Sequence, residues 1–182
     1  MNLAGLILRA AGWHVNITVP PYPRSVICVA PHTSNWDFVL GKLAYASVGR
    51  KAGFLMKESW FFFPLGYFFR AMGGIPVPRK GKNGSLVNLM VEKFKASKSL
   101  SIAITPEGTR KITKDWHTGF LQVAWQAGVP ILLGAIDFPS KTISIEHTFI
   151  PTGDTDNDMR EIKNITAGSA ASIPTNFPPI DS

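Results

Sequence analysis

The chain has 182 residues, of which 45% are hydrophobic and 17% are charged. This length favours a single domain over residues 1–182, and the composition excludes an intrinsically disordered chain. No stretch reaches the ~20 apolar residues that a membrane-spanning helix needs. The one cysteine, Cys28, excludes an internal disulfide and favours a reducing compartment.

The predicted elements alternate between helix and strand along the chain. At the N-terminus, residues 1–13 place an apolar stripe on one helical face, so this segment either lies in a membrane interface or covers the core. Strands are expected at 25–30, 53–56, 75–77, 100–104, 130–136 and 142–149, and helices at 36–48, 85–97, 120–127 and 156–168. Alternation predicts an α/β fold with helices flanking a sheet. Residues 174–182 are expected to form an extended surface tail.

Positive charge is concentrated toward the N-terminus. Residues 1–114 hold 16 basic and 4 acidic side chains, a net charge of +12, whereas residues 115–182 hold 3 basic and 8 acidic side chains, a net charge of −5. Such a field attracts anionic lipid, phosphate, acidic carrier proteins or nucleic acid. Nucleic acid is disfavoured because no recognised binding motif accompanies the charge.

The segment 60–69 is unusually aromatic, and Pro64 is expected to start or kink a helix there. Two interpretations are open: the segment contacts lipid, or it packs into the core. A lipid role is favoured because so many large apolar groups exceed what one helix face usually buries. Lys57, just before the segment, is expected to be a contact for an anion.

The first chemical motif, His32 to Asp37, directly follows the first predicted strand. Histidine suits proton transfer near neutral pH, and a carboxylate on its other ring nitrogen would orient it. Five positions along a helix rotate by ~500°, which would leave the two side chains ~140° apart. A working pair therefore needs His32 in the loop and Asp37 in the first helical turn, which the capping residues 33–35 favour. Alternatively, Asp37 serves only the helix end.

Two further motifs follow predicted strands. Residues 104–110 (ITPEGTR) place a hydroxyl, a carboxylate and the guanidinium of Arg110 in one turn, and arginine grips phosphate with two parallel hydrogen bonds. Residues 73–79 (GGIPVPR) combine glycines, which allow close backbone approach, with a second candidate phosphate contact, Arg79. Taken singly, the first motif is better explained as a turn that merely connects elements, and the second is equally well explained as a solvated basic loop.

Together with Val129–Ile131, these blocks form an ordered pattern. The sequence resembles the lysophospholipid acyltransferase family, which includes lysophosphatidate and glycerol-3-phosphate acyltransferases. That family carries His-x-x-x-x-Asp, Gly-x-x-Phe-Ile-x-Arg, Phe-Pro-Glu-Gly-Thr-Arg and a Val-Pro-Ile-like block in this order, and the resemblance covers about residues 25 to 137. Thr105 stands where the family usually has Phe, and Pro76 and Pro78 depart from its second block.

The resemblance implies a central mixed, largely parallel sheet flanked by helices. It also implies a single acyltransferase domain that moves a fatty acyl chain from acyl-CoA or acyl-carrier protein to the free hydroxyl of lysophosphatidate or a related lysophospholipid, in phospholipid biosynthesis. His32 would act as the general base and Asp37 would orient it. No cofactor and no metal are expected. The protein is expected in the cytoplasm, peripheral on the inner face of the membrane.

The resemblance further assigns the substrate contacts. Arg79 and Arg110 would hold the phosphate of the acceptor, Glu107 would lie near its glycerol hydroxyl, and Gly108 and Thr109 would shape the turn. The partners are therefore a membrane lipid surface, the thioester donor and the lysophospholipid acceptor, with no nucleic acid.

Several alternatives are open at this point. The acceptor is instead an aminolipid or another lysolipid, or the protein is a lipid hydrolase or a non-catalytic lipid-binding module. The remaining histidines, His14, His117 and His147, are scattered and predict no metal site. His117 lies near the third block, and a surface position is favoured over contact with substrate. Cys28 is expected to pack in the core.

Overall fold

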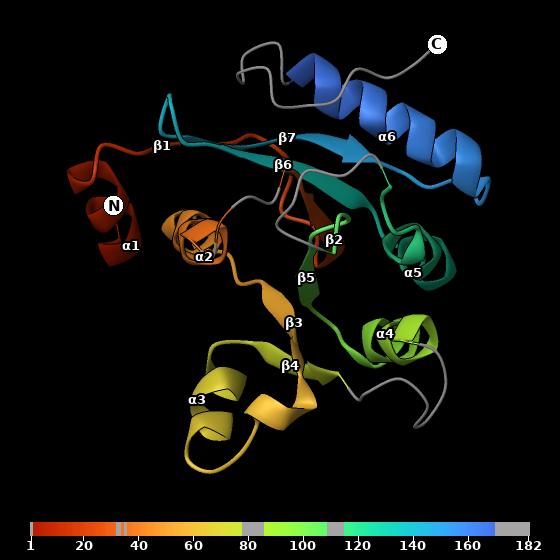
Figure 1. The fold of residues 1–182 in the computed structure, drawn as a ribbon, viewed down its shortest axis with the longest axis horizontal. Coiled ribbons are helices and arrows are strands. Elements are labelled where there is room, and N and C mark those ends of the chain that lie inside the picture. Colours follow the sequence, from red (N-terminus) through yellow and green to blue (C-terminus); the bar gives the residue numbers. More distant parts are fainter. Residues whose placement is uncertain (1, 32–33, 35, 78–85, 109–114, 170–182) are drawn as a thin grey trace.

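The centre of the protein is a seven-stranded sheet (Figure 1). The computed structural model describes residues 2–31, 34, 36–77, 86–108 and 115–169. The strand order is β1-β7-β6-β2-β5-β3-β4. The strands are β1 (His14–Ile17), β2 (Arg24–Val29), β3 (Gly53–Lys57), β4 (Gly74–Val77), β5 (Leu100–Ile104), β6 (Ile131–Asp137) and β7 (Thr142–Phe149).

The strand directions make the sheet mixed and largely parallel. β2 pairs in parallel with β5 and with β6, and β3 pairs in parallel with β4 and β5. β7 runs antiparallel to β6, and β1 runs parallel to β7. The expected architecture is therefore confirmed. Its consequence is that β2, β5, β3 and β4 all end at the same edge of the sheet.

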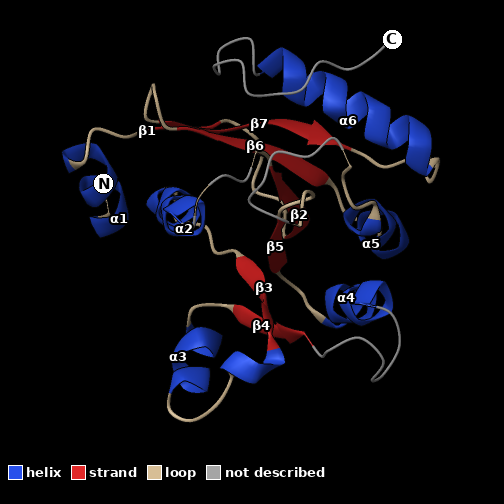
Figure 2. Ribbon diagram, in the orientation of Figure 1, coloured by secondary structure: helices blue, strands red, loops and turns tan. Residues whose placement is uncertain are grey.

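Helices cover both faces of the sheet (Figure 2). The helices of the described residues are α1 (Leu3–Ala10), α2 (Trp36–Ser47), α3 (Leu65–Ala71), α4 (Leu86–Ala96), α5 (Gly119–Ala127) and α6 (Thr155–Ser169), with a short 3₁₀ turn, η1 (Glu58–Trp60). None of them is long and apolar enough to cross a membrane.

The two faces of the central strands pack against different helices because successive side chains of a strand point to opposite sides. Val26 and Cys28 of β2 lie in a core shared with α4, α5 and α6, whereas Ile27 lies in a second core with Tyr45 of α2. Leu8 of α1 joins a third cluster with α2 and the strands β6 and β7. β2 is thus buried on both faces, as its unbroken apolar run predicts.

Most predicted elements are present at nearly the predicted positions, but β1 was not predicted. It is a four-residue strand with alternating exposed and half-buried residues, so its signal is short and only half apolar. In α1, Leu8 is the residue that packs into the core, whereas Leu3, Leu6 and Ile7 of the predicted apolar stripe are exposed. The predicted tail at 174–182 lies outside the described residues.

Candidate active site

The start of α2 holds the carboxylate of Asp37 in a buried position. The side chain is only 5% exposed, and its Oδ2 accepts a hydrogen bond from the Ser34 backbone N–H at 2.9 Å. In return, the Asp37 N–H donates to the Ser34 carbonyl oxygen at 3.2 Å, and the Trp36 N–H donates to the Ser34 hydroxyl at 3.1 Å. Asp37 therefore lies in the first turn of α2, as predicted, and Ser34 caps the helix start.

Asp37 also lines a cavity of about 410 Å³ between α2 and the sheet. On the helix side the cavity extends from Asp37 past Gly41 to Tyr45, a distance of about 12 Å along the α2 axis. On the sheet side it is lined by β2, β3, β5, β6 and β7, largely through aliphatic side chains such as Ile27, Val29 and Ile145. The site is thus a deep apolar space with a buried acid at the carboxyl edge of the sheet.

Gly41 opens this cavity from the helix side. A methyl group built at its Cα would meet no atom within 4 Å, although the residue lies in the middle of α2 and lines the cavity. Glycine in a helix interior costs roughly 0.5–1 kcal/mol relative to alanine. The sequence therefore accepts a weaker helix at the position where a side chain would take up cavity space, and a glycine inside the predicted helix 36–48 is the sequence signal for it.

The turn after β5 brings a second carboxylate to the same edge. Thr105 lines the cavity, and Glu107 is 4% exposed. Burial, together with the negative charge of Glu107, raises the pKa of the Cys28 thiol near the end of β2. Cys28 is a buried core residue, as predicted.

His117 packs directly on this turn. Gly108 has φ +60°, and a Cβ at that position would lie 2.7 Å from Cδ2 of His117. The His117 backbone N–H donates to the Pro106 carbonyl oxygen at 2.8 Å. The imidazole is exposed, as predicted, but it lies against Gly108, beside the buried Glu107. Its position makes His117 part of the candidate site, in addition to the surface position that the sequence favoured.

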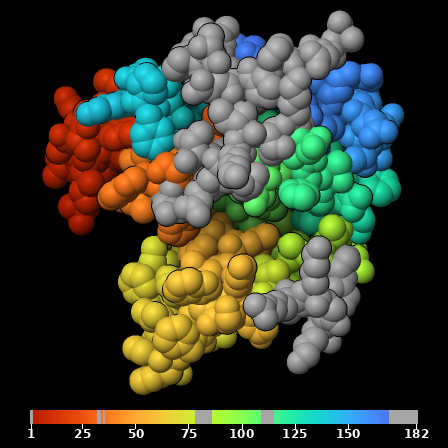
Figure 3. All heavy atoms as spheres, viewed as in Figure 1, coloured from red at the N-terminus to blue at the C-terminus, as the bar shows by residue number. Residues whose placement is uncertain are grey.

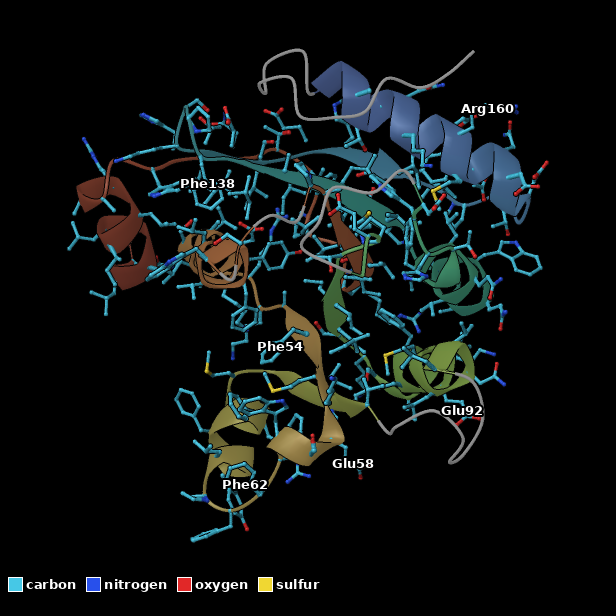
Figure 4. All side chains as sticks on the ribbon, viewed as in Figure 1. Phe54, Glu58, Phe62, Glu92, Phe138 and Arg160 are labelled. Atoms are coloured by element: carbon cyan, nitrogen blue, oxygen red, sulfur yellow. The ribbon has the colours of Figure 1, made fainter. Side chains whose placement is uncertain are left out.

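Lys42 of α2 connects the cavity wall to the backbone just before β3 and just after α3. Its Nζ lies 2.7 Å from the Ala52 carbonyl oxygen and 2.6 Å from that of Met72, and donates to both. The ammonium group also lies 5.7 Å from the centre of the Phe54 ring, which Figure 4 labels between β3 and α2. Burial lowers the pKa of Lys42. This residue was not singled out in the sequence because its partners are distant along the chain.

The other predicted site residues divide into two groups. Lys57 is exposed at the end of β3, at the same sheet edge. The positions of His32, Arg79, Thr109 and Arg110 lie outside the described residues. Among the described residues, no group of three or more His, Cys, Asp or Glu side chains is placed to hold a metal ion.

Comparisons with known proteins agree on one family. Residues 15–136 match the family model described as Acyltransferase. A 1-acyl-sn-glycerol-3-phosphate acyltransferase from Streptococcus pneumoniae is 28% identical over 123 residues, which are 67% of this chain and 45% of that relative. The chain therefore spans less than half the length of this curated relative.

The fold has a solved counterpart. The crystal structure of the 1-acyl-sn-glycerophosphate (LPA) acyltransferase PlsC from Thermotoga maritima superposes with a TM-score of 0.66 at 18% identity, covering 97% of this chain and 78% of that one. At this identity the likeness concerns the fold.

The contact between Gly108 and His117 is testable through stability. Gly108→Ala is expected to lower the free energy of unfolding, because the new methyl group meets the imidazole and φ is positive. Gly49→Ala is the matched control: its φ is +75° and its Cβ meets nothing within 4 Å, so it should cost only the backbone strain of about 1 kcal/mol. Urea denaturation should show the larger loss for G108A.

Adding His117→Ala to Gly108→Ala should remove the excess loss and leave only the strain seen in G49A. If G108A and G49A lose equal stability, the imidazole does not pack on this turn.

Proposed function

Because this chain belongs to the acyltransferase family, we propose that it transfers a fatty acyl chain from a thioester donor to the free hydroxyl of lysophosphatidate or a related lysophospholipid. Acyl-CoA and acyl-carrier protein are the two donor classes proposed. The family match over residues 15–136 and the printed activity of the Streptococcus relative support this reaction class.

One observation carries the proposal: the buried Asp37 carboxylate lies on the wall of a cavity that is otherwise largely apolar. The volume of about 410 Å³ is in the range of ~300–1,000 Å³ that small-molecule pockets occupy. Aliphatic walls favour a hydrocarbon chain, because burying apolar surface is favourable wherever no polar group is left without a partner. Asp37, near the sheet edge, would lie next to the thioester end of the bound acyl chain, where the reaction occurs.

In the proposed mechanism, His32, which closely follows β2 in the sequence, takes the proton from the acceptor hydroxyl as general base. The hydroxyl oxygen attacks the thioester carbonyl carbon, the new C–O bond forms, and the C–S bond breaks. The proton held by His32 passes to the departing thiolate. Asp37 orients His32 and stabilises its charged form, and the hydrogen bond from the Ser34 N–H holds that carboxylate in place.

The acceptor would bind at the sheet edge where β4 and β5 end. Arg79 and Arg110 are proposed to hold its phosphate, since guanidinium groups match phosphate geometry. Glu107 would accept a hydrogen bond from the glycerol, with Gly108 and Thr109 shaping the turn. Lys57, exposed at the end of β3, would add a further cationic contact to the acceptor's phosphate.

These substrates place the proposed reaction at a membrane, because the acceptor is a membrane lipid. We propose a peripheral location on the cytoplasmic face. The positive charge of residues 1–114 supports attraction to an anionic surface, and the single cysteine favours a reducing compartment.

His32→Ala is expected to lower acyl transfer by about 10²-fold or more, because general-base catalysis contributes on that order. Purified protein would be incubated with acyl-CoA or acyl-carrier protein and a panel of lysolipids, with products identified by mass spectrometry. His147→Ala is the control, because that histidine is exposed on β7. Unchanged transfer by H32A would exclude the mechanism, and fatty acid released without any acceptor would indicate a hydrolase.

Asp37→Asn should remove the charge while keeping an oxygen that accepts from the Ser34 N–H. We therefore expect a rate lower by about 10²-fold or more with the fold intact, as for a carboxylate that orients a catalytic histidine. Asp156→Asn, an exposed residue in the first turn of α6, is the matched control. Initial rates and circular dichroism would be compared, and a rate near that of the wild type would remove Asp37 from the mechanism.

Gly41→Leu should shorten the acyl chain that the enzyme prefers, because Gly41 lines the cavity, a Cβ there meets no atom within 4 Å, and a larger side chain would take up cavity space. Gly168→Leu in α6 is the control, since its Cβ also meets nothing and that residue is exposed away from the cavity. Competition among donors of different chain length would measure the preference. An unchanged profile in G41L, with the usual profile in G168L, would show that the cavity does not hold the chain.

A further inference from the structure

An exposed aromatic surface lies on η1, α3 and the loop between them. Six large side chains within nine residues are exposed, a set we call the α3 surface: Trp60, Phe62, Phe63, Leu65, Tyr67 and Phe68. Phe63 is 81% exposed and Tyr67 is 70% exposed. Figure 4 shows Phe62 at the outer end of the molecule, and Figure 3 shows this part of the chain, in gold and yellow, at the end opposite α6. Apolar patches of this kind mark interaction sites.

The charge around this surface is positive. Residues 51–77 contain three basic side chains, Lys51, Lys57 and Arg70, and one acidic side chain, Glu58. Arg70 lies 5.5 Å from the centre of the Phe61 ring, so its guanidinium is held next to the aromatic residues. Aromatic side chains flanked by basic ones suit the boundary between acyl chains and anionic headgroups. A second copy of the same positive surface would instead be repelled.

The α3 surface is held in a fixed arrangement. Lys42 of α2 donates to the Met72 carbonyl oxygen just after α3, and the Phe54 N–H donates to the Gly73 carbonyl oxygen at 3.1 Å. Gly66 lies so close to Phe61 that a Cβ would approach its carbonyl oxygen to 2.6 Å. Docking therefore requires little ordering of the backbone, which favours binding.

The α3 surface follows a wall of the cavity along the chain. Phe54, Leu55 and Met56 of β3 line the cavity, and the chain then passes through Lys57 into η1. A lipid held at the α3 surface would therefore lie next to β3, the strand whose apolar residues line the cavity that also contains Asp37. This continuity favours a lipid partner over a protein partner.

We propose that the α3 surface is the site at which this protein docks onto an anionic lipid bilayer. The aromatic side chains enter the interface between headgroups and acyl chains, and Lys57 and Arg70 contact anionic headgroups. The inference deepens the proposed function and rests on it only for the nature of the substrate. Docking itself is measured without any substrate, so a failure of acyl transfer leaves it testable.

The experiment is cosedimentation of the purified protein with vesicles of phosphatidylcholine alone and of phosphatidylcholine with phosphatidylglycerol. Phe63→Ser with Tyr67→Ser removes the two most exposed rings, which contact each other at 6.2 Å between centroids. Leu3→Ser with Leu6→Ser on α1 is the matched control, because those residues are also exposed and apolar. Near-ultraviolet circular dichroism and thermal unfolding would verify that both variants are folded.

The wild type should bind the anionic vesicles more tightly than the neutral ones. F63S/Y67S should lower the affinity for anionic vesicles by at least about tenfold. This is the loss expected when a large apolar side chain is no longer transferred from water into the bilayer interface. L3S/L6S should lose less.

Three results would overturn the proposal. In the first, folded F63S/Y67S binds anionic vesicles as the wild type does. In the second, L3S/L6S loses as much affinity as F63S/Y67S or more, which would assign docking to α1. In the third, the wild type binds neither kind of vesicle and instead forms dimers in sedimentation equilibrium that F63S/Y67S dissociates, which would assign the surface to a second copy of the chain.

Discussion

At the centre of the sheet, β2 pairs in parallel with β5 on one side and with β6 on the other. This pairing sets where the chemistry lies, because strands that run the same way deliver the residues that follow them to one edge. The turn with Glu107 follows β5, and the capped start of α2 follows β2. Both Asp37, which is 5% exposed, and Glu107, which is 4% exposed, are buried where these segments follow their strands. Without this parallel register, Asp37 and Glu107 would have no reason to share an edge.

The cavity is a consequence of what α2 lacks. Helices that cover a sheet normally fill the space beneath them, and protein interiors contain few voids larger than a water molecule. Here Gly41 leaves a side chain out of the middle of the covering face, where a Cβ would meet no atom within 4 Å. A space of about 410 Å³ left among aliphatic side chains forgoes dispersion contacts. A hydrocarbon chain in this space would restore the lost contacts, which supports the proposed acyl donor.

Local patterns in the sequence predicted most of the fold and part of the site. The apolar run of β2 and the capping residues before α2 are local signals, because each depends only on residues adjacent in the sequence. For this reason the prediction that Asp37 lies in the first helical turn is confirmed. β1 was missed because a four-residue edge strand takes its register from β7, which lies far along the chain. Lys42 and His117 were not assigned to the site for the same reason. Their partners, Met72 and Gly108, become neighbours only through tertiary packing.

Lys42 shows how these parts depend on one another. An ammonium group between two backbone carbonyl oxygens fixes the distance between α2, which carries Asp37, and the end of α3. Because burial disfavours its charged form, the lysine is a costly choice for a merely structural contact. Three hydrogen-bond donors on one flexible stem, however, allow a single residue to tie two separate segments to one helix. Lys42 therefore connects the segment just after α3 to α2, the helix that carries Asp37 and forms one wall of the cavity.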